Sequence, residues 1–494
     1  MGAANVPRPR QPSPASISGR GSAGVRPPAR DLLFTRSALG VALGLSTGLA
    51  LTSLALPSAP GYDPWSWLIW GRELGGLDLS TSEGPAWKPL PVIVTAALAP
   101  LGEAMAPSAW LGVARTGAIL AVLVAFGLAR RLAGGSSAAG LGAAAGLLLV
   151  PGWIEHAAVG NAEGALTALL LLGLAGLLEG RVRAALALVA VAALIRVEVW
   201  PFLAVLVAAV WRRDGNVRPW LVVGSVGVLA LWFVPEWLAS GDPLRSADRA
   251  RAPNPGAPAL AARPALATLA QAARAPHPAA LAGLVLLLAA SRHRRGRDAL
   301  LTGLAGLAWM LLVAGMSELG FSGEVRYLVP GVALVVVAGT AGLFVAASAA
   351  RERIRRLPDH AVAGVMAAAL ALFALDRSDT IGEQTARAVH GAALAADLDR
   401  AIDLAGGAGR LLRCGPPYVG RYRGPLLAWA LGVRKAEVAF SPSRPGVAFR
   451  SRLTPASRVE PSMPPPEWRV RTARWEIAGS CRRPGARGRA IRVP

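Results

Sequence analysis

The segment GYDPWSWLIWGREL, residues 61–74, places the acid Asp63 and the base Arg72 among three tryptophans, directly after an apolar run. A carboxylate in such a position can act as a general base, which takes a proton from a hydroxyl group within hydrogen-bond distance. Pro64 follows Asp63 and suits the first turn of a helix, so Asp63 can equally be the N-cap residue of that helix. On these residues alone both roles stay open, catalytic base and helix cap.

Several cationic residues that could hold a phosphate group lie close to the ends of apolar segments. Lys88 stands in WKPLPVIV, and Arg326 stands beside Tyr327 in GEVRYLVP. Cations placed where negative charge develops stabilise a transition state, and a tyrosine hydroxyl can donate a further hydrogen bond. Arg72, Lys88, Arg326 and Tyr327 are therefore candidates for binding an anionic group such as a phosphate. The alternative is that these residues anchor the chain at a membrane interface.

A second set of ionisable residues could line a substrate cavity. Arg196 and Glu198 lie inside an apolar run, where charged side chains are costly and commonly serve function. They can bind a substrate or form an ion pair with each other. The complete set of cavity candidates is Glu163, Arg196, Glu198, Glu236 and Asp242. The sequence contains no cysteine cluster with metal-ligand spacing, no phosphate-binding glycine loop and no Ser-His-Asp signature.

The composition indicates that these residues belong to a membrane protein. Of the 494 residues 53% are hydrophobic and 16% are charged, whereas a soluble protein carries about 25% charged residues. Several apolar stretches exceed the roughly 20 residues that a helix needs to cross a hydrocarbon core. The net charge of +23 could indicate a nucleic-acid partner. The basic residues, however, fall in short clusters between apolar runs, and a nucleic-acid partner is not expected.

Short loops rich in arginine stay in the cytoplasm, and this rule predicts a topology. The chain should cross the membrane about eleven times, with the N-terminus inside and the C-terminus outside. The predicted spans are 33–57, 108–129, 138–152, 163–180, 184–196, 199–211, 219–234, 279–291, 299–317, 325–349 and 361–376. Asp63, Lys88 and Arg326 then all lie toward the outer face of a multi-pass plasma membrane protein of bacterial type.

The run AALALVAVAALIRVEVWPFLAVLVAAVW, residues 184–211, is too short for two full spans and too long for one. We predict two short halves that meet at Arg196–Pro201, with Pro201 breaking the helix. Irregular backbone at membrane depth is tolerated where it lines a polar cavity or is buried in protein. The break therefore predicts a cavity that opens to the outside.

Three regions are expected along the chain. Residues 1–32 are rich in Pro, Arg, Ser and Gly and predict a disordered, basic cytoplasmic tail. Residues 33–376 form the transmembrane domain, with surface helices in its first outer loop, 58–107. The helix that begins at Asp63 is expected to lie at the membrane surface, with its tryptophans at headgroup depth. Residues 377–494 predict a small α/β domain outside the membrane. Short strands are expected at RLLRCG, AEVAFS, GVAFRS and WRVRTARWEIAGS, and a helix at GPLLAWALGV. The domain's residues Cys414 and Cys481, the only cysteines of the chain, are either a disulfide or two unpaired core residues.

The order of these elements resembles the GT-C superfamily of polyprenyl-phosphate-dependent glycosyltransferases, in the branch of protein O-mannosyltransferases and lipid A aminoarabinose transferases. The matching features are Asp63 after the first span, WKPLPVIVTAALAPLG at 87–102, Arg115 early in the next span, and RYLVP at the start of a late helix. Many relatives carry an acidic pair where this chain has Asp63 followed by Pro64. The resemblance therefore implies no certain cofactor, because a site for a divalent metal ion would lack one of the two expected carboxylates.

The resemblance implies an all-α polytopic fold of about eleven helices and an inverting hexosyl or pentosyl transfer. The donor is expected to be a polyprenyl-phosphate-linked sugar, and the acceptor a lipid, glycan or protein at the outer face. Asp63 would be the general base. Arg72, Lys88, Arg326 and Tyr327 would bind the phosphate of the departing polyprenyl group. Two alternatives come from other classes: a transporter or lipid flippase, or a membrane scaffold without catalysis. A transporter should show inverted repeats and a cavity at mid-membrane, whereas an enzyme of this type needs acidic and basic outer residues around one cavity near the surface.

Overall fold

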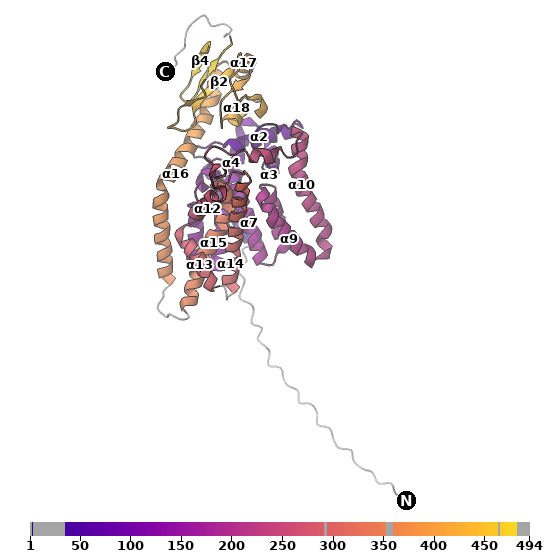
Figure 1. The fold of residues 1–494 in the computed structure, drawn as a ribbon, viewed down its shortest axis with the longest axis vertical. Coiled ribbons are helices and arrows are strands. Elements are labelled where there is room, and N and C mark those ends of the chain that lie inside the picture. Colours follow the sequence, from indigo (N-terminus) through magenta and orange to yellow (C-terminus); the bar gives the residue numbers. More distant parts are fainter. Residues whose placement is uncertain (1, 3–34, 291–293, 352–358, 463–464, 482–494) are drawn as a thin grey trace. The chain divides into compact units, whose positions relative to one another are not determined.

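The computed structural model describes Gly2 and residues 35–290, 294–351, 359–462 and 465–481. These residues form a bundle of helices and a small sheet close to the C-terminus (Figure 1). The tail predicted at 1–32 lies outside the described residues, apart from Gly2. The two predicted structural classes, a helical bundle and a C-terminal α/β region, are both present.

Each of the predicted spans coincides with a helix. These helices are α1 (Arg36–Ser53), α4 (Gly102–Leu132), α5 (Ser137–Leu148), α7 (Glu163–Leu178), α8 (Val182–Ala193), α9 (Trp200–Arg213), α10 (Arg218–Ser240), α13 (Pro278–Ala290), α14 (Arg294–Glu318), α15 (Val325–Arg351) and α16 (Asp359–Leu404). Among the described residues, five helical segments are long and apolar enough to cross a membrane, or six if one bent pair counts as a span, and others are shorter apolar helices. The number of eleven crossings stays a prediction.

Helix α15 is the central element of the bundle, because other parts of the protein bury its residues 328–338. Its neighbour α13 approaches so closely that a Cβ atom on Gly339 would lie 1.9 Å from the backbone oxygen of Ala280, and one on Gly283 would lie 1.9 Å from that of Gly339. Small residues let transmembrane helices come together in this way. The close packing fixes the position of α15, whose first turn carries Arg326.

The predicted break within 184–211 is present, but its cause differs from the prediction. Helix α8 ends at Ala193, a single 3-10 turn follows (η2, Val197–Val199), and α9 begins at Trp200. Pro201 was expected to break the helix. It instead occupies the first turn of α9, where a missing N–H has no intrahelical partner to lose. The irregular residues are therefore 194–199, which leaves Arg196 and Glu198 outside both long helices.

The segments between the spans add short helices that gather at one end of the bundle. They are α2 (Tyr62–Gly75), α3 (Pro89–Leu98), η1 (Ala99–Leu101), α6 (Trp153–Ala158), α11 (Arg245–Ala250), η4 (Pro258–Leu260) and α12 (Pro264–Arg274), while η3 (Gly215–Val217) joins α9 to α10. The two surface helices predicted in the loop 58–107 correspond to α2 and α3.

Two expectations for α2 are wrong. The N-cap residue is Gly61, and Asp63 lies in the first turn without capping it. The helix was also expected to lie at the membrane surface with its tryptophans at headgroup depth. Trp67 and Trp70 are instead fully buried, because α2 packs against α3 on one side and against the C-terminal region on the other. Trp65 meets Trp429 of that region, with ring centroids 5.8 Å apart.

The C-terminal region begins as a continuation of the last span. Helix α16 runs without interruption from Asp359 to Leu404, through the domain boundary predicted at 377, which stays a prediction. The region then contains α17 (Ala408–Cys414), α18 (Gly424–Ala430) and η5 (Lys435–Glu437), with the strands β1 (Pro417–Tyr418), β2 (Val447–Arg452), β3 (Val459–Glu460), β4 (Trp468–Arg471) and β5 (Glu476–Gly479). The sheet order is β1-β2-β5-β4, and β3 pairs with β2.

The strands predicted at GVAFRS and WRVRTARWEIAGS and the helix predicted at GPLLAWALGV are confirmed as β2, β4, β5 and α18. The strand expected at RLLRCG is wrong, because these residues form α17. In AEVAFS only Ala439 makes a bridge, to Tyr418.

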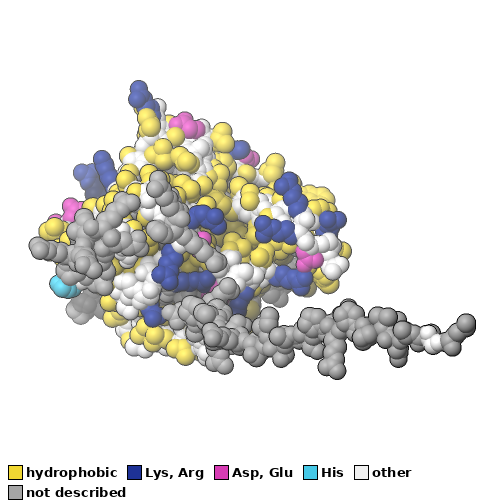
Figure 2. All heavy atoms as spheres, turned by 90° about the horizontal axis from the view of Figure 1, so that it is seen from below, with side chains coloured by type: hydrophobic (Ala, Val, Ile, Leu, Met, Phe, Trp, Pro, Cys, Tyr) yellow, Lys and Arg dark blue, Asp and Glu magenta, His cyan; other side chains and the backbone are white. Residues whose placement is uncertain are grey.

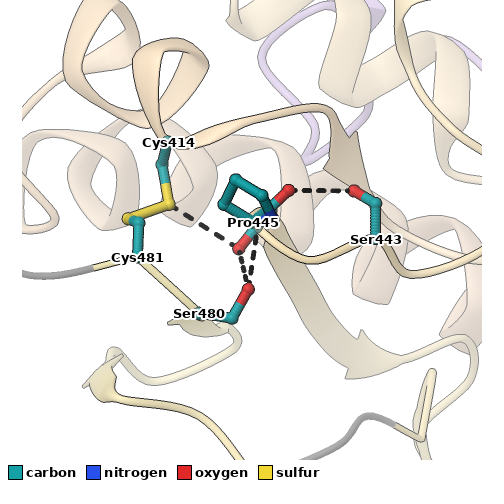
Figure 3. The surroundings of a disulfide bond; sticks show 6 residues. Cys414, Ser443, Pro445, Ser480 and Cys481 are labelled. Carbon is teal, nitrogen blue, oxygen red and sulfur yellow. Dashed lines mark hydrogen bonds between the residues drawn. A yellow bond between two sulfur atoms is a disulfide. The ribbon is translucent and has the colours of Figure 1, made fainter.

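Cys414 and Cys481 form a disulfide, with their Cα atoms 5.6 Å apart, as one of the two sequence interpretations predicted. The bond joins the end of α17 to the residue that follows β5 and Ser480 (Figure 3). Ser480 also pairs with Gly446, since Gly446 N donates to Ser480 Oγ at 3.0 Å and Ser480 N donates to Gly446 O at 3.1 Å. The last described residues are thus held to the sheet covalently and by hydrogen bonds.

Basic side chains occur at the end of the bundle that faces the viewer in Figure 2, among hydrophobic ones. The last turn of α4 contains Arg130 and Arg131, and the last turn of α9 contains Arg212 and Arg213. This distribution matches the arginine clusters from which the topology was predicted. Which face of a membrane this end meets stays a prediction.

Candidate active site

A cavity of about 840 Å³ lies where the short helices, the break between α8 and α9, the first turn of α15 and the C-terminal region come together. Its lining includes Asp63, Lys88, Arg196, Glu198 and Arg326. Its apolar lining includes Trp200, Trp232, Phe233, Val313 and Met316. The cavity therefore has one wall of ionisable side chains and one of aromatic and aliphatic side chains.

Asp63 lies between two cations that come from distant parts of the chain. Its Oδ2 atom is 3.2 Å from Nη1 of Arg326 and 3.4 Å from Nζ of Lys88. The side chains of Asp63 and Lys88 are only 12% and 11% exposed. Three residues that the sequence singled out for one reaction are thus brought together by the fold.

The ionised state of Asp63 is stabilised by its neighbours. Burial acts to raise the pKa of the Asp63 carboxyl, but the charges of Lys88 and Arg326 outweigh that effect and hold the pKa below its usual value. Burial likewise lowers the pKa of Lys88, and Asp63 acts against this. Lys88 also lies over the ring of Trp67, with Nζ 4.9 Å from the ring centroid. The site therefore holds a carboxylate and two cations whose side chains are largely buried.

A second group of charges adjoins the first. Nη2 of Arg196 is 2.5 Å from Oε1 of Glu163, and Nη1 of Arg196 is 3.5 Å from Oε1 of Glu198. The Arg196 guanidinium lies 4.2 Å from the ring centroid of Tyr327, whose hydroxyl accepts a hydrogen bond from Nη2 of Arg326 at 3.1 Å. The ion pair between Arg196 and Glu198 is confirmed, and both residues also line the cavity.

The position of Asp63 depends on the close approach of α2 to α3. A Cβ atom on Gly71 would lie 2.6 Å from the backbone carbon of Thr95, so no larger residue fits between the helices. The hydroxyl of Thr95 donates to the Trp67 carbonyl at 2.7 Å. At the N-terminal end, Gly61 N donates to the Val159 carbonyl at 2.8 Å. Helix α2 is therefore fixed at its start and in its middle, which positions Asp63 in its first turn.

Arg72 does not line the cavity, although it was predicted to bind a phosphate. Its guanidinium contacts Glu103 at 3.1 Å, the carbonyl of Val433 at 2.9 Å and the face of Trp429 at 5.1 Å. Arg72 lies nine residues after Asp63 on α2, and this spacing places it at the far end of the helix. Its contacts hold the C-terminal region to the bundle.

Glu163, Glu236 and Asp242 also lie outside the cavity lining, against the prediction. Glu236 is fully buried and binds Arg245, with Oε1 2.6 Å from Nε. Asp242 is exposed, and its Oδ1 accepts a hydrogen bond from Leu244 N at 2.8 Å. Arg115, which the family pattern singled out, donates to backbone carbonyls of Ser53 at 2.9 Å and Ala158 at 2.8 Å. These residues shape the walls of the site from behind.

The sequence reasoning missed the contribution of the C-terminal region. Arg421, Tyr422, Lys435 and Phe440 line the same cavity as Asp63. One signal was present in the composition: Lys88 and Lys435 are the only lysines in a chain with 52 basic residues. Both line the cavity. His156 lines it too, and its Nδ1 atom lies 3.0 Å from Nδ2 of Asn161.

The described residues contain no group of three or more His, Cys, Asp or Glu side chains that could hold a metal ion. Pro64, which follows Asp63, is buried in the first turn of α2 and offers no second carboxylate. Within the described part of the chain, the side chains that pair with Asp63 are the cations Arg326 and Lys88, which do not bind a divalent metal ion.

Comparisons with known proteins give structural neighbours only. No protein-family model and no curated protein matches the sequence. The fold is similar to the crystal structure of ArnT from Cupriavidus metallidurans bound to undecaprenyl phosphate, with 18% identity, a TM-score of 0.45, and coverage of 82% of this chain and 75% of that chain. The apo structure of the same protein gives 19% identity, a TM-score of 0.44 and the same coverage.

Proposed function

We propose that this protein is a membrane glycosyltransferase that moves a sugar from a polyprenyl phosphate to an acceptor hydroxyl at the outer face of the membrane. The observation that carries the proposal is the placement of Asp63 Oδ2 at 3.2 Å from Arg326 and 3.4 Å from Lys88, at the wall of an 840 Å³ cavity. An acid beside two cations supplies the base and the phosphate ligands that such a transfer needs.

The chemistry assigns a role to each of the three residues. The acceptor oxygen forms a bond to the anomeric carbon of the sugar while the bond from that carbon to the phosphate oxygen breaks, with inversion. Asp63 accepts the proton of the acceptor hydroxyl. Arg326 and Lys88 bind the departing polyprenyl phosphate, whose negative charge increases as the bond breaks.

The ion pairs of Asp63 with Arg326 and Lys88 couple donor binding to activation of the base. Arg326 and Lys88 have one carboxylate oxygen in common as their partner. A donor phosphate competes for the same two cations, and its binding draws them away from Asp63. The carboxylate is then free to accept a hydrogen bond from the acceptor hydroxyl. The pairs seen here also prevent an unpaired buried charge when no donor is bound.

The neighbouring charges of Glu163, Arg196, Glu198 and Tyr327 suit a role in holding the donor sugar and phosphate. Arg196 contacts the ring of Tyr327 and two carboxylates, so it is held in place before any ligand binds. Sugars, whether hexose or pentose, are recognised through hydroxyl groups that carboxylates and guanidinium groups bind. The apolar wall with Trp200, Trp232 and Phe233 suits a prenyl chain.

The geometry favours an enzyme over a transporter. The cavity is lined by loops, short helices and helix ends from one end of the bundle, together with the C-terminal region. A transporter cavity is expected near the middle of the spans and between repeats. A scaffold without catalysis gives no reason to bury an acid between two cations at a cavity wall, because burying charges costs free energy.

The test is an assay of the purified protein in proteoliposomes with a panel of radiolabelled polyprenyl-phosphate sugars and a crude envelope extract as acceptor. We expect one of these donors to lose its sugar to the extract, and nucleotide sugars to remain unused. Consumption of no donor, or movement of an unmodified lipid or solute across the vesicle membrane, would contradict the proposal. Hydrolysis of the donor in the absence of an acceptor would support the proposed donor site and leave the acceptor unidentified.

A further inference from the structure

We propose that Lys435 forms a second anion-binding subsite in the cavity, which recognises a carboxylate or phosphate group on the acceptor. That the ligand is the acceptor rests on the function proposed above. The anion site itself rests on the surroundings of Lys435. It lies in the wall contributed by the C-terminal region, separate from the cations that pair with Asp63.

Lys435 is a largely buried residue whose ammonium group has no polar partner among the described residues. The residue is 4% exposed, and it lines the cavity. Among the described residues, none accepts a hydrogen bond from its Nζ atom and no carboxylate lies within 4.0 Å of it. Its contact is the ring of Phe440, whose centroid lies 4.5 Å from Nζ. A buried cation without an anionic partner is costly, and a ligand that supplies the anion would remove that cost.

The charges that line the cavity also favour an anion-binding site at Lys435. The described lining contains six Lys and Arg residues but only three acids, Asp63, Glu198 and Glu324. Each of these acids pairs with an arginine of the Arg196–Arg326 group. The cations at the other wall, which include Lys435 and Arg421, are therefore not neutralised by acids of the lining. Burial lowers the pKa of Lys435, and the more distant Glu83 acts to raise it.

The local structure is shaped to admit a lysine at this point. A Cβ atom on Gly424 would lie 2.6 Å from Cε and 3.2 Å from Nζ of Lys435, so the lysine chain fills the space that this glycine leaves. A guanidinium group is larger and planar. Lys88 and Lys435, the only lysines of the chain, both line the cavity. We attribute the use of lysine at these positions to the limited room for the cation.

The loop before α18 supports a role in ligand binding. Tyr422 has φ +66°, a left-handed conformation that bulky residues rarely adopt, and its side chain is 40% exposed and lines the cavity. Arg421 precedes it and is exposed at the same wall. Next in the chain, Arg423 is buried and donates to the Ser451 carbonyl at 2.7 Å, which holds the loop to the sheet. The loop thus presents one cation and one phenol beside Lys435.

The experiment compares two small ligands, phenyl β-D-glucuronide and phenyl β-D-glucoside, which differ only at C6, where the first carries a carboxylate and the second a neutral hydroxymethyl group. Their binding to the purified full chain in nanodiscs is measured by ligand-observed NMR titration. We expect the wild-type protein to bind the glucuronide about tenfold more tightly, the effect of roughly 1.4 kcal/mol. In K435M the two affinities should become equal. Phenyl phosphate, measured in parallel, shows whether the subsite prefers a phosphate to a carboxylate.

Two variants serve as controls. Arg458 is an exposed cation of the C-terminal region outside the cavity lining, and R458M should keep the tenfold preference. R326M removes a cation of the other wall and should also keep the preference for the glucuronide. G424A keeps the lysine but occupies its space, so it should weaken the preference while the protein stays monodisperse.

Three results would overturn the subsite: no preference in the wild-type protein, a preference that survives in K435M, or one that is lost in R326M alone. Loss in R326M alone would show that the anion binds at the wall of Asp63. Because binding needs no catalysis, an inactive protein whose preference still depends on Lys435 would support the subsite and contradict the glycosyltransferase proposal.

Discussion

Arg326 and Asp63 are 263 residues apart in the chain, yet Nη1 of the arginine lies 3.2 Å from Oδ2 of the aspartate. The contact joins the first turn of α15, the central helix, to the first turn of α2, which the C-terminal region covers. A phosphate that binds Arg326 must loosen this pair. Donor binding and release of the proposed base are therefore one event at this contact.

Arg326→Ala should impair use of the donor more than it impairs the maximal rate. Removing a hydrogen-bonded charge costs about 1.5–3 kcal/mol, which corresponds to roughly 10–100-fold in the apparent affinity for the donor. The measurement is transfer rate against donor concentration. A KM for the donor equal to that of the wild-type protein would reduce Arg326 to a structural partner of Asp63.

Arg72→Ala is the matched control for Arg326→Ala. Sequence reasoning placed both arginines at the donor phosphate, but Arg72 contacts Glu103, Val433 and Trp429. Its loss should leave the KM for the donor unchanged and lower the thermal stability of the purified protein, because it removes contacts between α2 and the C-terminal region. An equal rise in KM for both variants would show that the donor site extends to Arg72.

The difference between Arg326 and Arg72 shows what the sequence could and could not predict. Hydropathy and arginine clusters located every long helix, because length and polarity alone decide which segments can cross a membrane. Asp63, Lys88 and Arg326 were found because each stands at the end of an apolar segment. Arg72 shares that property, and only the packing of Trp429 against α2 separates it from the site.

The contribution of the C-terminal region could not be predicted because it depends on how two distant parts pack together. Lys435 lies in a short turn without a recognisable motif, and its role follows from Gly424 and from the cavity wall that it joins. The burial of α2 was missed for the same reason. Its three tryptophans suit a membrane interface as well as a protein interface, and periodicity does not distinguish the two.

Cys414 and Cys481 should be protected from alkylation in the unreduced, denatured protein, because they form a disulfide. The bond closes a loop with a sequence separation of 67 residues, for which the chain-entropy account gives about 4 kcal/mol of stability. Replacing both cysteines by serine should lower the stability of the C-terminal region accordingly, as measured by limited proteolysis. Full labelling of both thiols without reductant would place this region in a reducing compartment.

Reporter fusions test the topology. A periplasmic reporter fused after Leu404, where α16 ends, should be active, and one fused within residues 295–297, at the arginine-rich start of α14, should be inactive. The arginine clusters are the basis for this expectation. The reverse pattern would place Asp63 and the C-terminal region in the cytoplasm and would exclude an outer-face donor.

Glu73 should make the protein less stable as the pH rises. Burial raises the pKa of its carboxyl to about 7, and the backbone N–H of Ser80, 3.0 Å from Oε2, acts in the opposite sense. Between pH 4.5 and 7 the folded protein therefore binds a proton that the unfolded chain has lost. In that window stability falls with rising pH, by at most about 1.4 kcal/mol per pH unit.

The variant Glu73→Gln isolates this effect, because glutamine keeps an oxygen that can accept from Ser80 N and does not ionise. Melting temperatures of both proteins in the same detergent at pH 5 and pH 8 provide the measurement. The variant should gain stability over the wild-type protein at pH 8 and match it at pH 5. A constant difference at both pH values would show that Glu73 does not titrate in this range.

Asp63→Asn tests the proposed base directly. The substitution keeps the size of the side chain and leaves the cap of α2 untouched, because the N-cap residue is Gly61. An amide cannot take the proton of the acceptor, and general-base catalysis contributes about 10²–10⁴-fold in rate. We therefore expect Asp63→Asn to fold and insert normally and to transfer sugar at least ~100-fold more slowly.

Donor binding separates loss of the base from loss of the site in this variant. Without a carboxylate to compete for Arg326 and Lys88, the donor phosphate meets two free cations. Asp63→Asn should therefore bind the polyprenyl phosphate as tightly as the wild-type protein or more tightly, which an equilibrium binding assay measures. Weaker binding would mean that Asp63 positions the cations and is no base. A near-normal transfer rate would move the search for the base to Glu163 and Glu198, the carboxylates paired with Arg196.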